Sequence, residues 1–146
     1  MNILIINGPN LNMLGIREKD IYGSQNYSDL VNYLNELGNI YNIDLEIFQS
    51  NHEGEIIDKL HEAYNNQVDA VVINPAAFTH YSYAIFDAIK AINIKTVEVH
   101  LSNIYKREGF RKTNVIKDAC VESFYGNGFE SYRDALEYLI GENKWN

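Results

Sequence analysis

Side chains that can transfer protons or bind hydroxyl groups gather directly after four short apolar segments of this sequence. They occupy residues 7–12 (NGPNLN), 49–54 (QSNHEG), 74–80 (NPAAFTH) and 100–103 (HLSN). Three of the four histidines, His52, His80 and His100, lie in these stretches. Amides, hydroxyl groups and imidazoles gathered in this way predict a polar recognition surface that can donate and accept protons.

Simpler explanations exist for each stretch taken alone. Residues 7–9 and 74–75 consist of common turn formers and, considered separately, favour a turn over a ligand site. His80 fits two roles equally well, contacting a ligand or hydrogen-bonding to the backbone. His61 lies in a helical segment that lacks the second histidine of a zinc-binding His-Glu-x-x-His, so we expect a surface residue there.

Arg17 and Tyr22 form a second candidate pair in residues 17–23 (REKDIYG). A phenol has a pKa of about 10 and becomes a usable base near neutrality only when a nearby cation, such as a guanidinium, stabilises its anion. Tyr22 is therefore a candidate general base. The alternative is that Tyr22, one of 11 tyrosines, is a packing or surface residue.

The charge balance limits the possible ligands. The 146 residues include 12 basic and 20 acidic side chains, for a net charge of −8. This acidity argues against general binding to nucleic acids or anionic membranes, which requires a basic surface. An anionic ligand would need local basic groups, and three of the four arginines, Arg17, Arg107 and Arg111, fall in two long predicted connections, residues 8–25 and 100–119.

Cysteine content and the N-terminal sequence bear on the compartment. A single cysteine, Cys120, excludes an intramolecular disulfide and favours a buried structural thiol. The first residues, MNILIIN, have neither a basic leader nor a cleavage site, and no apolar run approaches the roughly 18 residues that span a bilayer. We therefore expect a cytoplasmic protein.

Apolar segments alternate with segments of helical periodicity along the chain. Strands are expected at residues 2–7, 43–49, 68–73, 95–99 and 120–124. Several are apolar on both faces, which is typical of parallel strands covered by helices on both sides. The apolar helical faces are Leu30, Leu34, Leu37 and Tyr41; Ile56, Leu60 and Ala63; Ile85, Ala88, Ile89 and Ile92; and Tyr132, Leu136 and Leu139. Ser28 and Ser82 are the expected helix caps.

This alternation predicts an α/β fold, a flavodoxin-like five-stranded parallel sheet of order 2-1-3-4-5 with helices on both faces. The length fits one domain, so we expect a single domain over residues 1–146. Ligands of such sheets bind at the carboxyl ends of the strands, where the polar stretches lie, and long connections there are commonly lids or binding loops.

Several common chemistries lack their motifs in this sequence. No Gly-x-Gly-x-x-Gly follows the first strand, and there is no Walker loop and no Gly-x-Ser-x-Gly elbow. Asn74 stands where a phosphoacceptor domain of this architecture would have a carboxylate. A non-catalytic flavodoxin-like binding or regulatory module remains an alternative, although it leaves the clustered histidines and arginines unexplained.

Taken together, the segments resemble the type II 3-dehydroquinate dehydratase family of the shikimate pathway. The matching stretches are residues 6–18, 22–23, 49–54, 73–82, 87–88, 98–103, 107–108 and 110–111, in the family's order. The resemblance implies a flavodoxin-like fold and trans dehydration of 3-dehydroquinate to 3-dehydroshikimate through an enolate, without metal, cofactor or lysine Schiff base. A different lyase or isomerase acting on another polyhydroxy keto acid is the rival enzyme.

The resemblance also implies roles for single residues. Tyr22 would be the base that removes a proton alpha to the ketone, and Arg17, in a mobile lid, would favour the tyrosinate. Asn10 would hold the water that stabilises the enolate. His100 would be the general acid for the leaving hydroxyl, and Glu98 would fix its tautomer.

Substrate positioning and assembly follow from the same resemblance. The expected binding residues are Asn74, Leu101 and Ser102 for the carboxylate, and His80 and Arg111 for the ring hydroxyls. Asp87 would reach the site of a neighbouring subunit in a homododecamer, a tetramer of trimers. The sequence departs from the family pattern at Lys19, where proline is usual, and at Gly109 and Asn114, where an acidic residue and serine are usual.

Overall fold

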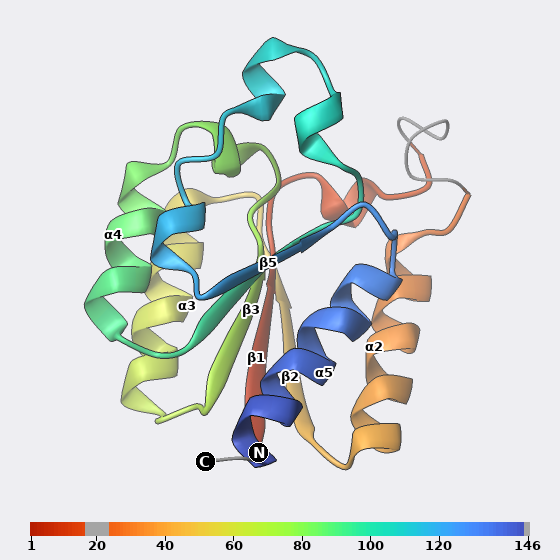
Figure 1. Cartoon of the computed structure of the whole chain (residues 1–146), viewed down its shortest axis with the longest axis vertical. Helices are drawn as coiled ribbons and strands as arrows, with labels where there is room; N and C mark the ends of the chain where they lie inside the picture. The colour runs from red at the N-terminus through yellow and green to blue at the C-terminus, as the bar shows by residue number, and fades with distance from the viewer. Residues whose placement is uncertain (17–23, 145–146) are drawn as a thin grey trace.

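The computed structural model describes residues 1–16 and 24–144 of the chain, which form a sheet between two layers of helices (Figure 1). Within these residues the sheet has five parallel strands: β1 (Asn2–Asn7), β2 (Asp44–Gln49), β3 (Ala70–Asn74), β4 (Thr96–His100) and β5 (Glu122–Tyr125). Their order is β2-β1-β3-β4-β5. The predicted sheet and strand order are confirmed.

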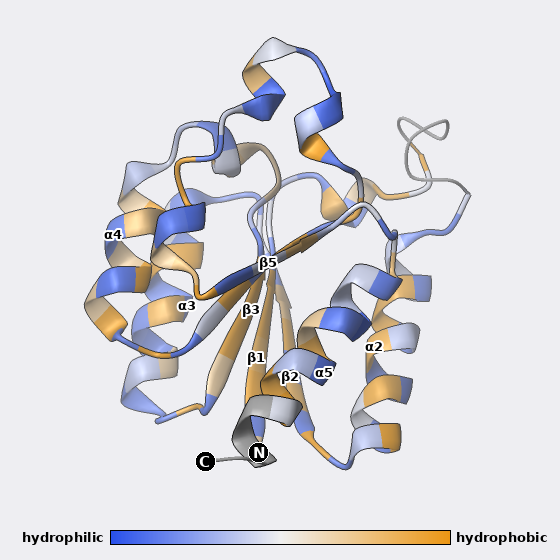
Figure 2. Ribbon diagram, viewed as in Figure 1, coloured by the Kyte–Doolittle hydropathy of each residue, from blue (hydrophilic) through white to orange (hydrophobic). Residues whose placement is uncertain are grey.

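In the part of the chain that the structure describes, two α-helices cover each face of the sheet. Helices α2 (Tyr27–Tyr41) and α5 (Glu130–Lys144) lie on one side, and α3 (Glu53–Asn65) and α4 (Tyr83–Ile92) on the other (Figure 1). Alternate residues of β1 enter the two cores, so that Ile3 packs with α2 and α5, and Leu4 packs with α3 and α4. Figure 2 shows the resulting hydrophobic colour along the central strands. None of the helices in the described residues is long and apolar enough to cross a membrane.

One of the two predicted helix caps is wrong. Ser82 caps α4, since its Oγ accepts a hydrogen bond from the Ile85 amide at 3.1 Å. Helix α2, however, is capped by Asn26 and not by Ser28. The Asn26 side chain accepts from the Asp29 amide, and the Asp29 carboxylate accepts from the Asn26 amide, both at 2.9 Å. This reciprocal pair satisfies two amides at the helix start, which a serine within the first turn cannot do.

Strand β1 starts at the predicted residue, and the other four strands start one or two residues later than predicted. For β3 and β5, turn contacts compete with the sheet. Val68 does not begin β3, since its amide donates to the Ala63 carbonyl at 3.1 Å and closes the end of α3. Cys120 does not begin β5, since its amide donates to the Lys117 carbonyl at 3.0 Å. Apolar character alone does not reveal these hydrogen bonds.

In the described residues, the long connections contain short 3-10 helices, most of which lie above the carboxyl ends of the strands, whereas the one that precedes β5 lies beside α4 (Figure 1). They are η1 (Leu11–Met13), η3 (Ile104–Lys106), η4 (Gly109–Lys112) and η5 (Lys117–Ala119), and η2 (Ala76–His80) follows β3. The segments leaving β1 and β3 touch at Gly8, where an added Cβ would lie 2.7 Å from the Pro75 carbonyl oxygen. Glycine permits this close approach of two backbones.

Candidate active site

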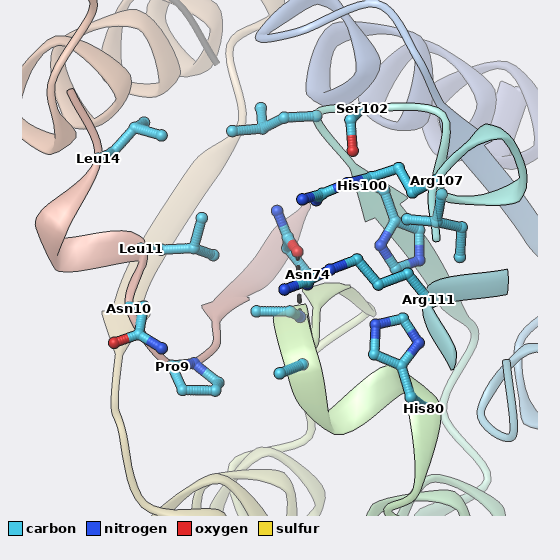
Figure 3. A pocket seen from close by; sticks show the side chains of 14 residues that line it. Pro9, Asn10, Leu11, Leu14, Asn74, His80, His100, Ser102, Arg107 and Arg111 are labelled. Atoms are coloured by element: carbon cyan, nitrogen blue, oxygen red, sulfur yellow. Dashed lines mark hydrogen bonds between the residues drawn. The ribbon is translucent and has the colours of Figure 1, made fainter. Parts of the chain in front are cut away.

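A cavity of about 150 Å³ lies at the carboxyl ends of β1, β3 and β4 (Figure 3). Its walls come from the polar stretches that follow these strands and from the loop that carries η3 and η4. The lining residues are Pro9, Asn10, Leu11, Leu14, Asn74, Ala76, Ala77, His80, His100, Leu101, Ser102, Ile104, Arg107 and Arg111. Figure 3 shows the imidazole and guanidinium groups on the side opposite Pro9, Asn10 and Leu11.

A buried hydrogen-bond chain fixes Asn74 at the base of the cavity. The Asn74 Nδ2 donates to the Tyr132 hydroxyl at 2.9 Å, and the Asn74 Oδ1 accepts from the Ala76 amide at 3.3 Å. Tyr132, on α5, donates in turn to the Asn7 Oδ1 at 2.6 Å. Burial raises the pKa of Tyr132, so its neutral hydroxyl acts as donor and acceptor at once. These contacts fix which end of the Asn74 amide is the donor, and its second N–H suits an anionic ligand.

His100 ends β4 and pairs with the fully buried Glu98 two residues earlier. The His100 Nε2 lies 2.9 Å from the Glu98 Oε2. The Glu98 carboxylate also accepts from the Asn114 Nδ2 at 2.9 and 3.0 Å and from the Ser123 hydroxyl at 2.5 Å. Burial by itself raises the pKa of Glu98, but the hydrogen bond and charge of His100 and the donors Ser123 and Asn114 lower it below 4.5 overall.

The ionised Glu98 determines the tautomer of His100. A carboxylate only accepts hydrogen bonds, so the His100 Nε2 carries the hydrogen that lies between the two groups. Nδ1 is then the ring nitrogen that can exchange a proton with a ligand.

His80 combines the two roles that its sequence context left open. Its Nδ1 donates to the Thr113 carbonyl at 2.7 Å, while the ring lines the cavity and packs edge-on against Phe110. Burial lowers the pKa of His80, and the charges of Arg111, His100 and Arg107 lower it further, against the opposing effect of the Thr113 carbonyl. His80 is therefore neutral near pH 7, and its Nε2 can accept a hydrogen bond from a hydroxyl.

Two arginines make the cavity cationic although the chain is acidic. Arg107 and Arg111 both line the cavity, and its described lining includes no carboxylate. The Arg111 Nε donates to the Glu108 Oε1 at 2.7 Å, and its guanidinium lies 4.7 Å from the centre of the Phe110 ring. These contacts orient the guanidinium toward a narrow range of positions, which suits recognition of a small anion.

The opposite wall is built from the turn after β1. Asn10 adopts a left-handed conformation with φ of 70°, and its amide donates to the Asn51 Oδ1 at 2.9 Å. The Gln49 Nε2 donates to the same Asn51 oxygen at 3.1 Å, so the turn is tied to the end of β2. Leu11 and Leu14 supply the apolar part of this wall. One side of the cavity therefore suits carbon–hydrogen surface and the other suits hydroxyl and carboxylate groups.

The sequence matches a known family over almost its full length. Residues 1–140 match the family described as dehydroquinase class II. The chain belongs to this family.

Named relatives of the class II dehydroquinase family agree with the match. A 3-dehydroquinate dehydratase from Caldicellulosiruptor saccharolyticus is 60% identical over 137 residues, 94% of each chain. The crystal structure of the type II dehydroquinase from Butyrivibrio crossotus superposes with a TM-score of 0.94 at 54% identity and covers 96% of this chain and 97% of that one. The type II dehydroquinase from Propionibacterium acnes gives a TM-score of 0.90 at 40% identity, with 94% of each chain covered.

The structure brings most of the predicted site residues of this dehydroquinase family member together. Those that line the cavity are Asn10, Asn74, His80, His100, Leu101, Ser102 and Arg111, and Glu98 lies directly behind His100. Asp87 is exposed on α4 and does not line the cavity. Arg17 and Tyr22 lie outside the described residues.

Three residues at or beside the cavity were not assigned a role from the sequence. Arg107 lines the cavity, and its position in the same long connection as Arg111 was the sequence feature that could have indicated this. The sequence indicated only that Tyr132 is a core position of a helix, but its hydroxyl accepts a hydrogen bond from the Asn74 side chain. Asn114 stood out only as a departure from the family pattern, yet it donates to Glu98. His61 is exposed on α3, as predicted.

Proposed function

We propose that this chain removes water from 3-dehydroquinate by trans elimination through an enolate and releases 3-dehydroshikimate. The observation that carries the proposal is the His100–Glu98 pair beside a cavity whose charged lining is cationic. The substrate is a small carboxylate with ring hydroxyls and a ketone, which fits such a lining. Relatives that are 50–60% identical bear the name of this hydro-lyase.

The proposed reaction needs a base and an acid on one substrate. Tyr22, as tyrosinate favoured by Arg17, takes the proton alpha to the ketone, and the electron pair forms an enolate whose oxygen is stabilised by a water held by Asn10. The enolate then collapses, the carbon–oxygen bond of the leaving hydroxyl breaks, and the imidazolium of His100 gives its Nδ1 proton to make water. Each proton transfer is worth about 10²- to 10⁴-fold in rate.

Glu98 accounts for the direction of the second proton transfer. Its carboxylate stabilises the charged form of His100 before the transfer, and it keeps hydrogen on Nε2 after Nδ1 has lost its proton. After this transfer, His100 is the neutral Nε2–H tautomer. Reprotonation of Nδ1 by solvent restores the acid for the next turnover.

In this proposal, different residues of the cavity lining bind different groups of the substrate. The Asn74 side chain, the backbone amides of Leu101 and Ser102, and the Ser102 hydroxyl take the carboxylate in this proposal. The neutral His80 accepts from one ring hydroxyl, and Arg111 donates to another. Because Asn74 and His80 each have one side fixed by a protein partner, they would not reorganise when the substrate binds.

The proposal includes assembly into a homododecamer, a tetramer of trimers. Asp87 is exposed on α4 and outside its own chain's cavity, so a role in substrate binding requires a neighbouring subunit. Light scattering of the purified protein tests this part. A monomer with full activity would contradict it.

Two variants test the chemical roles. Tyr22→Phe should fold normally and lose turnover by about 10²- to 10⁴-fold, because the base is removed. The matched control is Tyr64→Phe on α3, where the side chain is 60% exposed and lies outside the cavity, and its turnover should equal that of the wild type. Near-normal turnover of Tyr22→Phe would overturn the assignment of the base.

His100→Ala separates the two proton transfers. The variant retains the base but not the acid, so in D₂O the proton alpha to the ketone should exchange faster than product forms. Proton NMR of the remaining 3-dehydroquinate measures this exchange. A variant that neither exchanges nor eliminates would indicate that His100 acts in the first step, against the proposed order.

A further inference from the structure

Glu98 lies in a set of hydrogen bonds that the pairing with His100 does not by itself explain. Its side chain is fully buried, and its two oxygens accept from three side chains on three different segments. Asn114 is the only one of these partners among the described residues that reaches both oxygens, at 2.9 and 3.0 Å. Contact with both oxygens fixes the rotation of the carboxylate as well as its position.

The orientation of the Asn114 amide is determined by its own partners. Its Oδ1 accepts from the backbone amides of Ile116 and Lys117, at 3.0 and 2.9 Å. An oxygen that accepts two backbone hydrogens cannot exchange places with the NH₂ group without leaving both amides unpaired. The NH₂ group is therefore held toward Glu98, as a donor built into the loop before η5.

We propose that Asn114 is a positioning residue for His100, acting through Glu98. Its amide holds the carboxylate in the plane that keeps hydrogen on the His100 Nε2 and leaves Nδ1 for the substrate. The inference rests on the proposed role of His100 as the acid in turnover, but its geometric part concerns the protein without substrate.

A purely structural role for Asn114 makes different predictions. In that case the residue only caps the turn at Ile116 and Lys117 through Oδ1, which an aspartate at the same place would also do. Asn114→Asp therefore retains the cap and replaces the donor by a second carboxylate facing Glu98. Asn114→Ala removes both the cap and the donor.

The first experiment compares the pH profiles of kcat. Asn114→Ala should lose about 10- to 100-fold in kcat at every pH, the loss that is typical when a partner that orients a metal-binding histidine is removed. Asn114→Asp should show an additional ionisation, because the new carboxylate and that of Glu98 share a proton. Below the pKa of this pair, the shared proton restores a donor to Glu98, and above it the donor is lost. Its kcat should fall as the pH rises through this ionisation. The other ionisable groups beside this cluster, His100, Cys120 and Tyr105, are the same in all variants.

Asn103→Asp is the matched control. Asn103 caps η3 by accepting from the Tyr105 amide at 3.1 Å, as Asn114 does for its own turn, and it has no hydrogen bond to Glu98 among those the structure describes. Its pH profile should keep the wild-type shape. An Asn114→Asp profile of wild-type shape, with kcat unchanged, would overturn the inference.

The second measurement needs no turnover. The ¹⁵N shifts of the His100 ring report its tautomer in the protein without substrate, which should be Nε2–H in the wild type and a mixture of tautomers in Asn114→Ala. An unchanged tautomer would refute the positioning role. A changed tautomer in a protein that does not dehydrate 3-dehydroquinate would support the positioning role and refute the proposed function, so the two failures are distinguishable.

Discussion

Replacing Tyr132 with phenylalanine removes one oxygen atom from the centre of the hydrogen-bond chain below the cavity. The hydroxyl accepts from the Asn74 Nδ2 at 2.9 Å and donates to the Asn7 Oδ1 at 2.6 Å. Tyr132 and Asn7 are fully buried and Asn74 is 3% exposed, so bulk water does not take the place of the lost hydroxyl. The substitution leaves the ring in place but removes the hydrogen-bond partner of the Asn74 Nδ2 and of the Asn7 Oδ1.

The cost follows from those two groups. A buried polar atom that loses its partner costs about 1–3 kcal/mol. The Asn7 Oδ1 bears this cost in full, and the Asn74 Nδ2 bears less because it borders the cavity. We expect a loss of about 2–4 kcal/mol in the free energy of unfolding, which is a change of roughly 30- to 1,000-fold in the folding equilibrium. KM for 3-dehydroquinate should rise as well, because the Asn74 amide is no longer held in one orientation.

Tyr33→Phe provides the matched control. Tyr33 lies on α2 and packs on Phe129, and its buried hydroxyl makes no hydrogen bond to any residue that the structure describes. Its removal should leave stability within about 0.5 kcal/mol of the wild type or raise it. Urea unfolding of the three proteins at pH 7 and one protein concentration measures the difference. Equal stabilities of the two variants would refute the reasoning.

Three further outcomes are expected. Gly8→Ala should lower the free energy of unfolding by about 1–3 kcal/mol, because the new Cβ would lie 2.7 Å from the Pro75 carbonyl oxygen. Gly54→Ala, whose new Cβ would have nothing within 4 Å, should raise the free energy of unfolding by up to about 1 kcal/mol. Urea unfolding of the two variants measures the difference. The Cys120 thiol should react slowly with a disulfide reagent at pH 8 until urea unfolds the protein, since burial and then the charge of Glu98 raise its pKa; fast labelling in the native state would contradict this. Because the pKa of Glu98 lies below 4.5 in the folded protein, its carboxylate stabilises the fold above the unfolded pKa, and this contribution disappears as the pH falls through the folded pKa. Glu98→Gln should therefore flatten the decline of the free energy of unfolding below about pH 5. An unchanged slope would contradict this prediction.

The sheet could be predicted because several of its strands are apolar on both faces and helical periodicity separates the strands. Right-handed crossovers and five strands in so short a chain favoured the flavodoxin-like order, which the structure has. Predictions failed where one local hydrogen bond decided the outcome. Asn26 caps α2 in place of Ser28 because Asp29 completes a reciprocal pair, and Val68 is tied to α3 and not to the sheet.

The wall residues of the site could be predicted for a geometric reason. The carboxyl ends of parallel strands lie at one edge of the sheet, so Asn74 and His100, which end β3 and β4, and His80, which follows β3, lie close together there. The supporting residues could not be found in this way. Tyr132 is 58 residues from Asn74 and Asn114 is 16 residues from Glu98, and no periodic pattern relates either pair.

The charge balance gained meaning from the fold. A net charge of −8 argues against an anionic ligand only if the charges are spread evenly. Two of the arginines line the cavity, and its described lining has no carboxylate, so the charged side chains that face a ligand there differ in sign from the net charge. Position within the fold, which composition cannot give, decides what this chain can bind.

Turnover of 3-dehydroquinate by the purified protein tests the central claim most directly. The product contains a conjugated enone, so ultraviolet absorbance follows its formation in a buffer that contains a metal chelator. The account predicts an absorbance that rises in proportion to the concentration of the protein and is nearly abolished in Tyr22→Phe. No enone at protein concentrations equal to that of the substrate would contradict the claim.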